Sequence, residues 1–220
     1  MSDTEQKHVK DVYEAIAEHF SSTRGAKWKS VVSFLGLQNK GSVGIDFGCG
    51  NGKYLDTRPD LLIFGADTCG ALLSICGERG FHVLRGDILQ SPFRIGVFDF
   101  GISVAVIHHM STVGRREKAV EECLGSLRPG GLFIFTVWAL EQPADSKRVF
   151  SGQDVLVPWK TGDVVVERYY HVFVEGELEA LVGKYGEVID AGYEKGNWYA
   201  VVRRAGGLSS GFHLTCSEDR

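Results

Sequence analysis

Paired cysteines are missing from this sequence. The chain has an odd number of cysteines and no CxxC motif: Cys49, Cys69, Cys76, Cys123 and Cys216. Scattered, unpaired cysteines support neither a disulfide framework nor a zinc site. We therefore expect reduced thiols, as in proteins of the cytoplasm or the nucleus, and no metal centre.

Long apolar runs and an excess of basic charge are also missing. No apolar run approaches the roughly 18 residues that span a membrane, and the segment MSDTEQKHVK at 1–10 is polar, unlike a signal peptide. The formal net charge of −4 is not that of a protein whose whole surface coats nucleic acid, although an acidic domain can carry a local basic groove. We expect an intracellular protein of the cytoplasm, with the nucleus as the alternative, and without a membrane segment.

The spacing of apolar residues predicts both helices and strands. Helical spacing occurs over residues 4–20, 28–35 and 115–127, and the run RPGG that follows ends the third helix. Short apolar segments rich in branched and aromatic side chains predict strands at 42–48, 61–67, 82–88, 98–104 and 131–138. Strands of this kind that alternate with helices are typical of the α/β class, a parallel sheet with helices on both faces.

The second half of the chain is less regular. Residues 141–163 are polar and contain two prolines, Pro143 and Pro158, which predicts a loop insertion. A strand-like segment at 168–174 and a helical segment at 176–186 follow. The segments on either side of KGN at 195–197 then predict an antiparallel hairpin.

Together these elements predict a Rossmann-like α/β domain over 1–205. Its sheet is expected to be mostly parallel and seven-stranded, with the antiparallel hairpin at its C-terminal end. The domain divides into N-terminal helices, a cofactor-binding half, and substrate-side and closing elements, at residues 1–40, 41–138 and 139–205. Residues 206–220 show no packing pattern and are expected to form a flexible tail.

The stretch GIDFGCGNGKY at 44–54 looks like a nucleotide-binding loop. A dinucleotide loop needs GxGxxG, but here Lys53 stands in place of the third glycine. Asp46 would repel a pyrophosphate, whereas it would attract the sulfonium and ammonium groups of S-adenosylmethionine. The loop is therefore predicted to bind S-adenosylmethionine through Asp46, Gly48, Cys49, Gly50 and Asn51.

Two more acids stand near the ends of predicted strands. Asp67 ends the second strand, where a carboxylate can accept both ribose hydroxyls, and Asp87 closes the third and could reach the adenine edge. Either acid alone could equally cap a helix or face solvent. Because the carboxyl ends of parallel strands meet at one edge of the sheet, we expect these acids to converge there with Asp46. Side chains expected to complete the cofactor site are Tyr13, Ile88 and Val104.

Several strings resemble class I S-adenosylmethionine-dependent methyltransferases, from about Val9 to Arg204. Within that class they are similar to the eukaryotic tRNA wobble-uridine methyltransferases that esterify 5-carboxymethyluridine: VYEAIAEHFSSTR (12–24), GIDFGCGNGKYL (44–55), IHHMST (107–112), WALEQ (138–142), QDVLVPW (153–159) and GNWYAVV (196–202). The pairing of WALEQ with QDVLVPW is the more specific part, since cofactor binding does not require it. The sequence departs from this family in a short 143–152 segment and in Met110, where a tryptophan is common.

The resemblance implies a function, a cofactor and partners. It implies S-adenosylmethionine as the cofactor, the tRNA anticodon stem-loop as the substrate, and a heterodimer with a small zinc-containing activator protein. Two other functions stay open at this point. One is methylation of a small molecule of the quinone type, and the other is a regulatory protein that binds the cofactor without turnover.

An acceptor carboxylate would set particular demands on the catalytic residues. It is already ionised at neutral pH, so it needs orientation and removal of water rather than a strong base. Arg24 could grip this carboxylate bidentately, or it could hold the carboxylate of the cofactor's methionine instead. A third alternative is a surface arginine with neither role. His108 and His109 follow the fourth predicted strand, and we expect at least one of them to contact the target nucleotide.

Aromatic and basic side chains are candidates for RNA contacts. Trp138 could stack on a base or pack in the core, and Trp159 is expected to be the more exposed of the two. Basic residues that could meet phosphates, if folding gathers them on one rim, are Lys27, Lys29, Arg115, Arg116, Lys147, Arg148 and Lys160. As isolated charges they would instead belong to a solvated surface.

Overall fold

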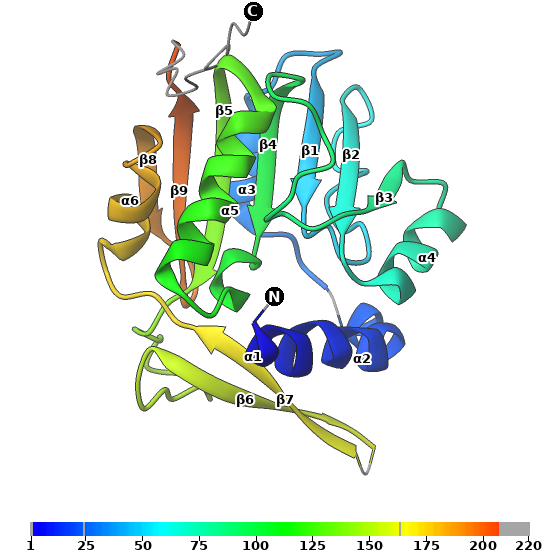
Figure 1. The fold of residues 1–220 in the computed structure, drawn as a ribbon, viewed down its shortest axis with the longest axis vertical. Helices are drawn as coiled ribbons and strands as arrows, with labels where there is room; N and C mark the ends of the chain where they lie inside the picture. The colour runs from blue at the N-terminus through cyan, green and yellow to red at the C-terminus, as the bar shows by residue number, and fades with distance from the viewer. Residues whose placement is uncertain (1, 24, 163, 207–220) are drawn as a thin grey trace, which may run out of the picture.

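A seven-stranded sheet forms the centre of the computed structural model, which describes residues 2–23, 25–162 and 164–206 (Figure 1). Its strands are β1 (Val43–Phe47), β2 (Leu62–Asp67), β3 (Val83–Arg85), β4 (Phe98–Val104), β5 (Leu127–Trp138), β8 (Gly186–Tyr193) and β9 (Asn197–Arg204). They lie in the order β3-β2-β1-β4-β5-β9-β8. The strand order reverses at β1, which lies between β2 and β4, and open sheets of this kind bind ligands at such a point.

The pairing directions agree with the predicted sheet. β1 to β5 pair in parallel, whereas β9 runs antiparallel to both β5 and β8. β8 and β9 are joined at Lys195 and Gly196, whose φ angles are 48° and 81°. Two successive residues with positive φ form the tight turn that matches the twist of a hairpin. The prediction of a mostly parallel, seven-stranded sheet with a C-terminal antiparallel hairpin is confirmed.

Helices cover both faces of this sheet, as predicted. They are α3 (Lys29–Gly36), α4 (Gly70–Glu78), α5 (Val113–Ser126) and α6 (Glu177–Val182). On one face, Phe34 of α3 packs against Phe100 of β4. On the other face, α5 and α6 join a core cluster that contains Phe133 and Phe135 of β5. Since both faces bury apolar side chains, the central strands read as continuous apolar runs rather than as an alternation.

The N-terminal helices cross the end of the sheet at which the parallel strands finish (Figure 1). They consist of α1 (Asp3–Glu5), a wider π-helical segment η1 (Gln6–Lys10) and α2 (Asp11–Ser22). The helix predicted over 4–20 is therefore confirmed, with a π segment inside it. The helices predicted over 28–35 and 115–127 are confirmed as α3 and α5, within two residues at each end.

A second, two-stranded sheet lies on the far side of the N-terminal helices and corrects two predictions (Figure 1). β6 (Asp154–Thr161) pairs antiparallel with β7 (Val164–His171). The loop predicted over 141–163 is thus wrong in its second half, and the segment predicted at 168–174 belongs to this hairpin only as far as His171. Pro158 is tolerated in β6 because, among the described residues, that strand pairs on one side only.

Some predictions have a smaller correction or fall outside the described ranges. The helix predicted over 176–186 is shorter and ends at Val182. Of the tail predicted at 206–220, only Gly206 is described. Among the helices of the described ranges, none combines the length and the apolar character needed to cross a membrane.

Candidate active site

A cavity lies between the carboxyl ends of β1, β2 and β4 and the N-terminal helices. It is lined by all the residues predicted to bind the cofactor: Tyr13, Asp46, Gly48, Cys49, Gly50, Asn51, Asp67, Asp87, Ile88 and Val104. His108, His109 and Trp138 line it as well, together with Tyr170. We refer to the part around the three acids as the cofactor end, and to the part around these two histidines and two aromatic residues as the acceptor end.

The glycine-rich loop after β1 has a backbone that favours glycine. The φ angles of Gly48, Gly50 and Gly52 are 76°, 55° and 79°. A Cβ on Gly48 would also lie 2.2 Å from a side-chain carbon of Val106, so that no larger residue fits there. Residues 50–56 then form successive turns rather than a regular helix. This loop brings the backbone close to the cavity between Asp46 and Asp67.

Asp46, in β1, is deeply buried, with 2% of its surface exposed. Its Oδ1 atom is enclosed and has no hydrogen-bond partner in the part of the chain that the structure describes. Burial, and then the negative charges of Asp67 and Cys76, raise the pKa of Asp46 well above its ordinary value. An ionised carboxylate in this setting is unfavourable on its own, so the position suits a ligand that brings positive charge.

Asp67, at the end of β2, holds the glycine-rich loop in place. Its Oδ2 accepts a hydrogen bond from the backbone N–H of Gly50 at 2.8 Å, and its Oδ1 accepts one from the N–H of Cys69 at 2.9 Å. Burial raises the pKa of Asp67, and these backbone hydrogen bonds only partly oppose that shift. Each carboxylate oxygen has a second lone pair, so Asp67 could still accept hydroxyl groups of a bound ribose.

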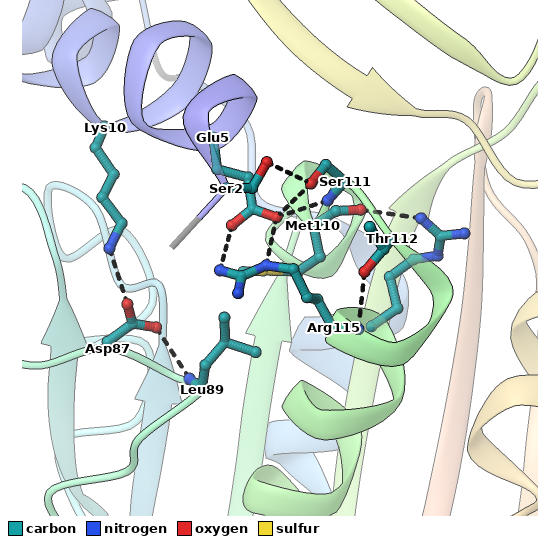
Figure 2. Close-up of polar contacts among 10 residues, drawn as sticks. Ser2, Glu5, Lys10, Asp87, Leu89, Met110, Ser111, Thr112 and Arg115 are labelled. Carbon is teal, nitrogen blue, oxygen red and sulfur yellow. Dashed lines mark hydrogen bonds and ion pairs between the residues drawn. The ribbon is translucent and has the colours of Figure 1, made fainter.

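Asp87, two residues after β3, is already paired with a lysine (Figure 2). Its Oδ2 lies 2.8 Å from Nζ of Lys10 in η1, and its Oδ1 accepts from the N–H of Leu89 at 3.0 Å. Burial alone would raise the pKa of Asp87, but the hydrogen bonds and charge of Lys10 and the N–H of Leu89 hold it below its ordinary value. The acid predicted to meet the adenine therefore also anchors the N-terminal helices.

Glu5 forms a second anchor for these helices, shown in Figure 2. This glutamate is 3% exposed and faces the guanidinium of Arg115 on α5 with two contacts, 2.7 Å to Nε and 2.6 Å to Nη2. It also accepts from the N–H of Ser111 at 2.7 Å and from the Ser111 hydroxyl at 2.9 Å. Although burial opposes ionisation, these donors hold the pKa of Glu5 below its ordinary value.

Three basic residues predicted to meet RNA have different settings. Arg115 is held by Glu5, as described above. Arg116 is 5% exposed and donates from Nη1 to the carbonyl of Met110 at 2.9 Å. Lys27 is exposed and donates to Asp56 at 2.9 Å. Of these three, only Lys27 has the exposed position that a phosphate contact needs, so the structure does not support an RNA rim that includes Arg115 and Arg116.

The two histidines follow β4 in the short helical turn η2 (Ile107–His109), and both are buried. Nδ1 of His109 lies 2.8 Å from the carbonyl of Tyr169, so this nitrogen donates. In the neutral ring Nε2 then accepts from the hydroxyl of Tyr13, at 3.0 Å. His109 therefore joins α2 to the β6–β7 hairpin, and it fixes the position of the Tyr13 hydroxyl at the cavity.

His108 belongs to the wall of the acceptor end. Its Nδ1 accepts from the backbone N–H of Trp138 at 3.0 Å, so the neutral ring carries its proton on Nε2. The ring of Trp138 is 8% exposed and stacks on that of Tyr170, with centroids 4.1 Å apart and planes 7° apart. Trp138 thus combines core packing with a place in the cavity wall.

Trp159 is not the exposed loop residue that the sequence predicts. It lies half-buried in β6, and its ring packs against His19 and Phe20 of α2, with centroids 5.4 Å and 6.0 Å away. Its Nε1 donates to Nδ1 of His19 at 3.1 Å. Trp159 therefore attaches the hairpin to α2 instead of standing free for a base. Arg24 lies outside the described residues, and both of its predicted roles stay predictions.

Sequence reasoning missed Lys10, Glu5 and Tyr170, which all line the cavity. The ion pairs of Lys10 and Glu5 join residues 77 and 110 positions apart, and no sequence pattern marks such pairs. Tyr170 could have been found, because strand periodicity over RYYH places it on the same face as Arg168. Within residues 2–23, 25–162 and 164–206, no group of three or more His, Cys, Asp or Glu side chains could hold a metal ion.

Comparison with known proteins identifies the family. Residues 45–135 match the family model described as "Methyltransferase domain". A protein of Schizosaccharomyces pombe, named tRNA (carboxymethyluridine(34)-5-O)-methyltransferase, is 40% identical over 224 residues that cover 91% of this chain and 97% of that protein. The chain belongs to the tRNA (carboxymethyluridine(34)-5-O)-methyltransferase family. The family predicted from the WALEQ and QDVLVPW strings is thereby confirmed.

Other members of this family are longer. The Xenopus tropicalis relative named tRNA (carboxymethyluridine(34)-5-O)-methyltransferase alkbh8 is 36% identical over 261 residues, which cover 92% of this chain and 42% of that protein. Among solved structures, a chain in the complex between the Haloferax volcanii Trm112 methyltransferase activator and a methyltransferase superposes with a TM-score of 0.68. The match covers 91% of this chain and 99% of that chain at 16% identity, so it shows the shared fold alone.

Proposed function

We propose that this chain transfers a methyl group from S-adenosylmethionine to the carboxylate of 5-carboxymethyluridine at the wobble position of tRNA. The observation that carries this proposal is the 40% identity with an enzyme of that name over nearly its whole length. The cavity supports it, because the buried Oδ1 of Asp46, which has no hydrogen-bond partner among the described residues, suits a cationic methyl donor.

The cofactor end contains the residues that would hold S-adenosylmethionine. Asp46 and the loop around Gly48 and Gly50 would face its charged amino-acid and sulfonium groups, and Asp67 would accept its ribose hydroxyls. When bound, the cofactor supplies an electrophilic methyl group on a positively charged sulfur. The chain's own part is to hold that group still, remove water from it, and place the acceptor in line with it.

The acceptor end would orient the target base. Its wall of Trp138 and Tyr170 is aromatic, and bases extruded from RNA stack on such surfaces. His108, with its proton on Nε2, is a hydrogen-bond donor that could orient an acceptor oxygen. A carboxylate acceptor needs no general base, since it is ionised at neutral pH.

The proposal includes a partner protein. The resemblance of the WALEQ and QDVLVPW strings to the wobble-uridine methyltransferases implies a small zinc-containing activator as its partner. A solved complex that contains a methyltransferase activator shares the fold, although its 16% identity supports no more than that. The net charge of −4 also favours sharing tRNA binding with a partner.

The test is transfer of labelled methyl from S-adenosylmethionine to tRNA that lacks the ester, with and without the activator. We expect label in the anticodon that mild base removes, because an ester hydrolyses whereas a C- or N-methyl group does not. Base-stable label would overturn the proposed ester. Transfer to a lipid quinone, with none to any RNA, would identify a small-molecule methyltransferase instead.

Arg24 can be assigned in the same assay. If its guanidinium holds the acceptor carboxylate, Arg24→Lys keeps the cofactor affinity and loses turnover, because an ammonium cannot grip a carboxylate with two parallel hydrogen bonds. If it holds the methionine carboxylate of the cofactor, the dissociation constant for S-adenosylmethionine rises. Isothermal titration with S-adenosylhomocysteine, beside single-turnover methyl transfer, separates the two roles.

A further inference from the structure

Arg168 on β7 is a buried cation with no acidic partner among the residues that the structure describes. It is 4% exposed, and its Nε atom is enclosed and makes no hydrogen bond to any of those residues. Among the acids of the described ranges, none forms a salt bridge with Arg168. A buried charge is normally paired, because taking it out of water without a partner is strongly unfavourable.

The surroundings of Arg168 are aromatic. Its guanidinium carbon lies 4.5 Å from the ring centroid of Trp159 and 5.3 Å from that of Tyr170. Ring faces attract a cation weakly but leave its N–H donors without acceptors. In the described part of the chain, the enclosed Nε of Arg168 therefore keeps an unsatisfied N–H donor close to Tyr170.

A second arginine stands on the same aromatic wall. The guanidinium carbon of Arg148 lies 4.1 Å from the ring centroid of Trp138, and Trp138 stacks on Tyr170. Arg148 is exposed, and it too has no salt bridge to an acid within the described part of the chain. Removal of water where its guanidinium packs on Trp138 lowers the pKa of Arg148; Tyr170 opposes this shift, and the positive charge of Arg168 adds to it. Two arginines that contact one aromatic wall and form no salt bridge within the described ranges are expected where an anionic ligand binds.

We propose that Arg168, with Arg148 at the rim, forms the subsite for the carboxylate of the acceptor base. This inference rests on the proposed function and names the part of the site that recognises the substrate. Tyr170 and Trp138 line the cavity, and Arg168 and Arg148 contact the rings of these two residues without lining it themselves. A short side group of a base that passes these rings would meet the arginines. The burial of Arg168 favours a carboxylate on an extruded base over a backbone phosphate, which stays on the outside of the RNA strand.

Pairing of the arginines with a carboxylate would also explain how the site distinguishes the substrate from the product. A carboxylate oxygen forms a bond to the methyl carbon while the carbon–sulfur bond breaks, and that electron pair returns to sulfur. The products are the methyl ester and S-adenosylhomocysteine, and no proton moves. Since the ester is neutral, it loses the charge that the arginines bind, so that the product leaves more easily than the substrate.

The experiment measures binding of two RNA stem-loops to the full chain, alone and with the proposed activator. One stem-loop carries 5-carboxymethyluridine at the wobble position, and the other carries the neutral 5-carbamoylmethyluridine. S-adenosylhomocysteine replaces the cofactor, so no turnover occurs. We expect the wild type to bind the acid about 10- to 100-fold more tightly than the amide, and Arg168→Gln to bind both alike. The matched control Arg203→Gln, on the exposed face of β9, should keep the wild-type preference.

Each contrary result overturns the inference. Equal binding of acid and amide by the wild type excludes a carboxylate subsite. An equal loss for both stem-loops in Arg168→Gln assigns the arginine to a phosphate, and an unchanged preference in that variant assigns it to packing. If circular dichroism shows that Arg168→Gln does not fold, the exposed Arg148→Gln replaces it, and it must reduce the preference at least about threefold.

The proposed function can fail separately. If the wild type forms a base-labile methyl ester on tRNA but Arg168→Gln keeps its preference for the acid, only the subsite is wrong. If the wild type transfers no methyl group to RNA, the proposed function is wrong. The binding comparison then still reports whether Arg168 recognises the carboxylate.

Discussion

The cofactor end and the acceptor end of the cavity differ in the charge that each leaves unpaired. At the cofactor end, the enclosed Oδ1 of Asp46 has no hydrogen-bond partner in the described part of the chain. Beside the acceptor end, the enclosed Nε of Arg168 also has none. The first atom lies in a strand of the parallel sheet, and the second lies in the separate β6–β7 hairpin. A buried acid at the cofactor end and a buried arginine behind the acceptor end would suit a cationic donor and an anionic acceptor.

The two ends also differ in the segments that their polar contacts join. Asp67 bonds two backbone N–H groups of its own loops, so the cofactor end is held by main-chain contacts. The acceptor end is held by side chains that join separate segments, such as Tyr13 with His109. We therefore expect substitutions at the acceptor end to change turnover, and those at the cofactor end to change affinity for the methyl donor.

Asp46→Asn should remove the most deeply buried negative charge of the cofactor end and give the largest effect. Affinity for S-adenosylmethionine should fall on the order of 100-fold, since a buried charge would then face a neutral amide. The exposed Asp145→Asn serves as the control. Isothermal titration measures the loss, and an affinity within threefold of the wild type would contradict the role of Asp46.

The same substitution should stabilise the cofactor-free protein. Because burial and neighbouring negative charges raise the pKa of Asp46, the folded state binds its proton more tightly than the unfolded state. The contribution of Asp46 to the free energy of unfolding is therefore lost as pH rises through that raised pKa. Asp46→Asn should gain in Tm relative to the wild type at pH 8 and gain less at pH 5. A Tm difference that does not depend on pH would contradict this explanation.

Glu5→Gln should loosen the N-terminal helices that cover both ends. The lost charge weakens the pairing with Arg115 and the bonds from Ser111, so we expect the free energy of unfolding to fall by about 2 kcal/mol. Chemical denaturation measures the change, with the exposed Glu187→Gln as the control. Since the pKa of Glu5 is lowered, the wild-type advantage should be present at neutral pH and disappear as pH falls through that lowered value.

Tyr13→Phe should affect the acceptor end and not the cofactor end, and it leaves the charges of Asp46 and Arg168 in place. It deletes the hydroxyl that bonds Nε2 of His109, and one such hydrogen bond contributes about 1 kcal/mol, or roughly fivefold in rate. We expect this loss in turnover while the cofactor affinity changes little. Tyr193→Phe removes a similar bond at a distant, partly exposed position and should leave turnover unchanged. A loss confined to cofactor affinity would move Tyr13 to the cofactor end.

Lys10→Met should make the net charge of the cofactor end more negative and give the smallest effect of these substitutions. It frees Asp87 from its ion pair, so the carboxylate can accept from the adenine amine without competition. Affinity for S-adenosylmethionine should rise about twofold, because partly exposed ion pairs contribute little. Lys118→Met on the surface of α5 is the control. A clear fall in affinity would show that Lys10 itself contacts the cofactor.

Much of the cofactor end could be predicted from the sequence, because it is built from short local patterns. The loop GIDFGCGNGKY and the positions of Asp67 and Asp87 at predicted strand ends were enough to place three acids at one edge of the sheet. The acceptor end could be predicted only in part. The sequence predicts a phosphate contact for both Arg115 and Arg116. In the structure, Arg115 pairs with Glu5, and Arg116 is buried beside Met110. Adjacent helix residues point in different directions, and the sequence does not show what each one meets.

The sequence by itself determined the parallel sheet and the loop for the methyl donor, because strand periodicity and glycine conformation act over a few neighbouring residues. Only the tertiary structure decided which charges are paired. Trp138, Arg148, Arg168 and Tyr170 come together through the β6–β7 hairpin, part of which the sequence predicts as a loop. Whether a buried charge has a partner depends on distances between segments far apart in the chain, and those distances exist only once the hairpin packs against α2 and β5.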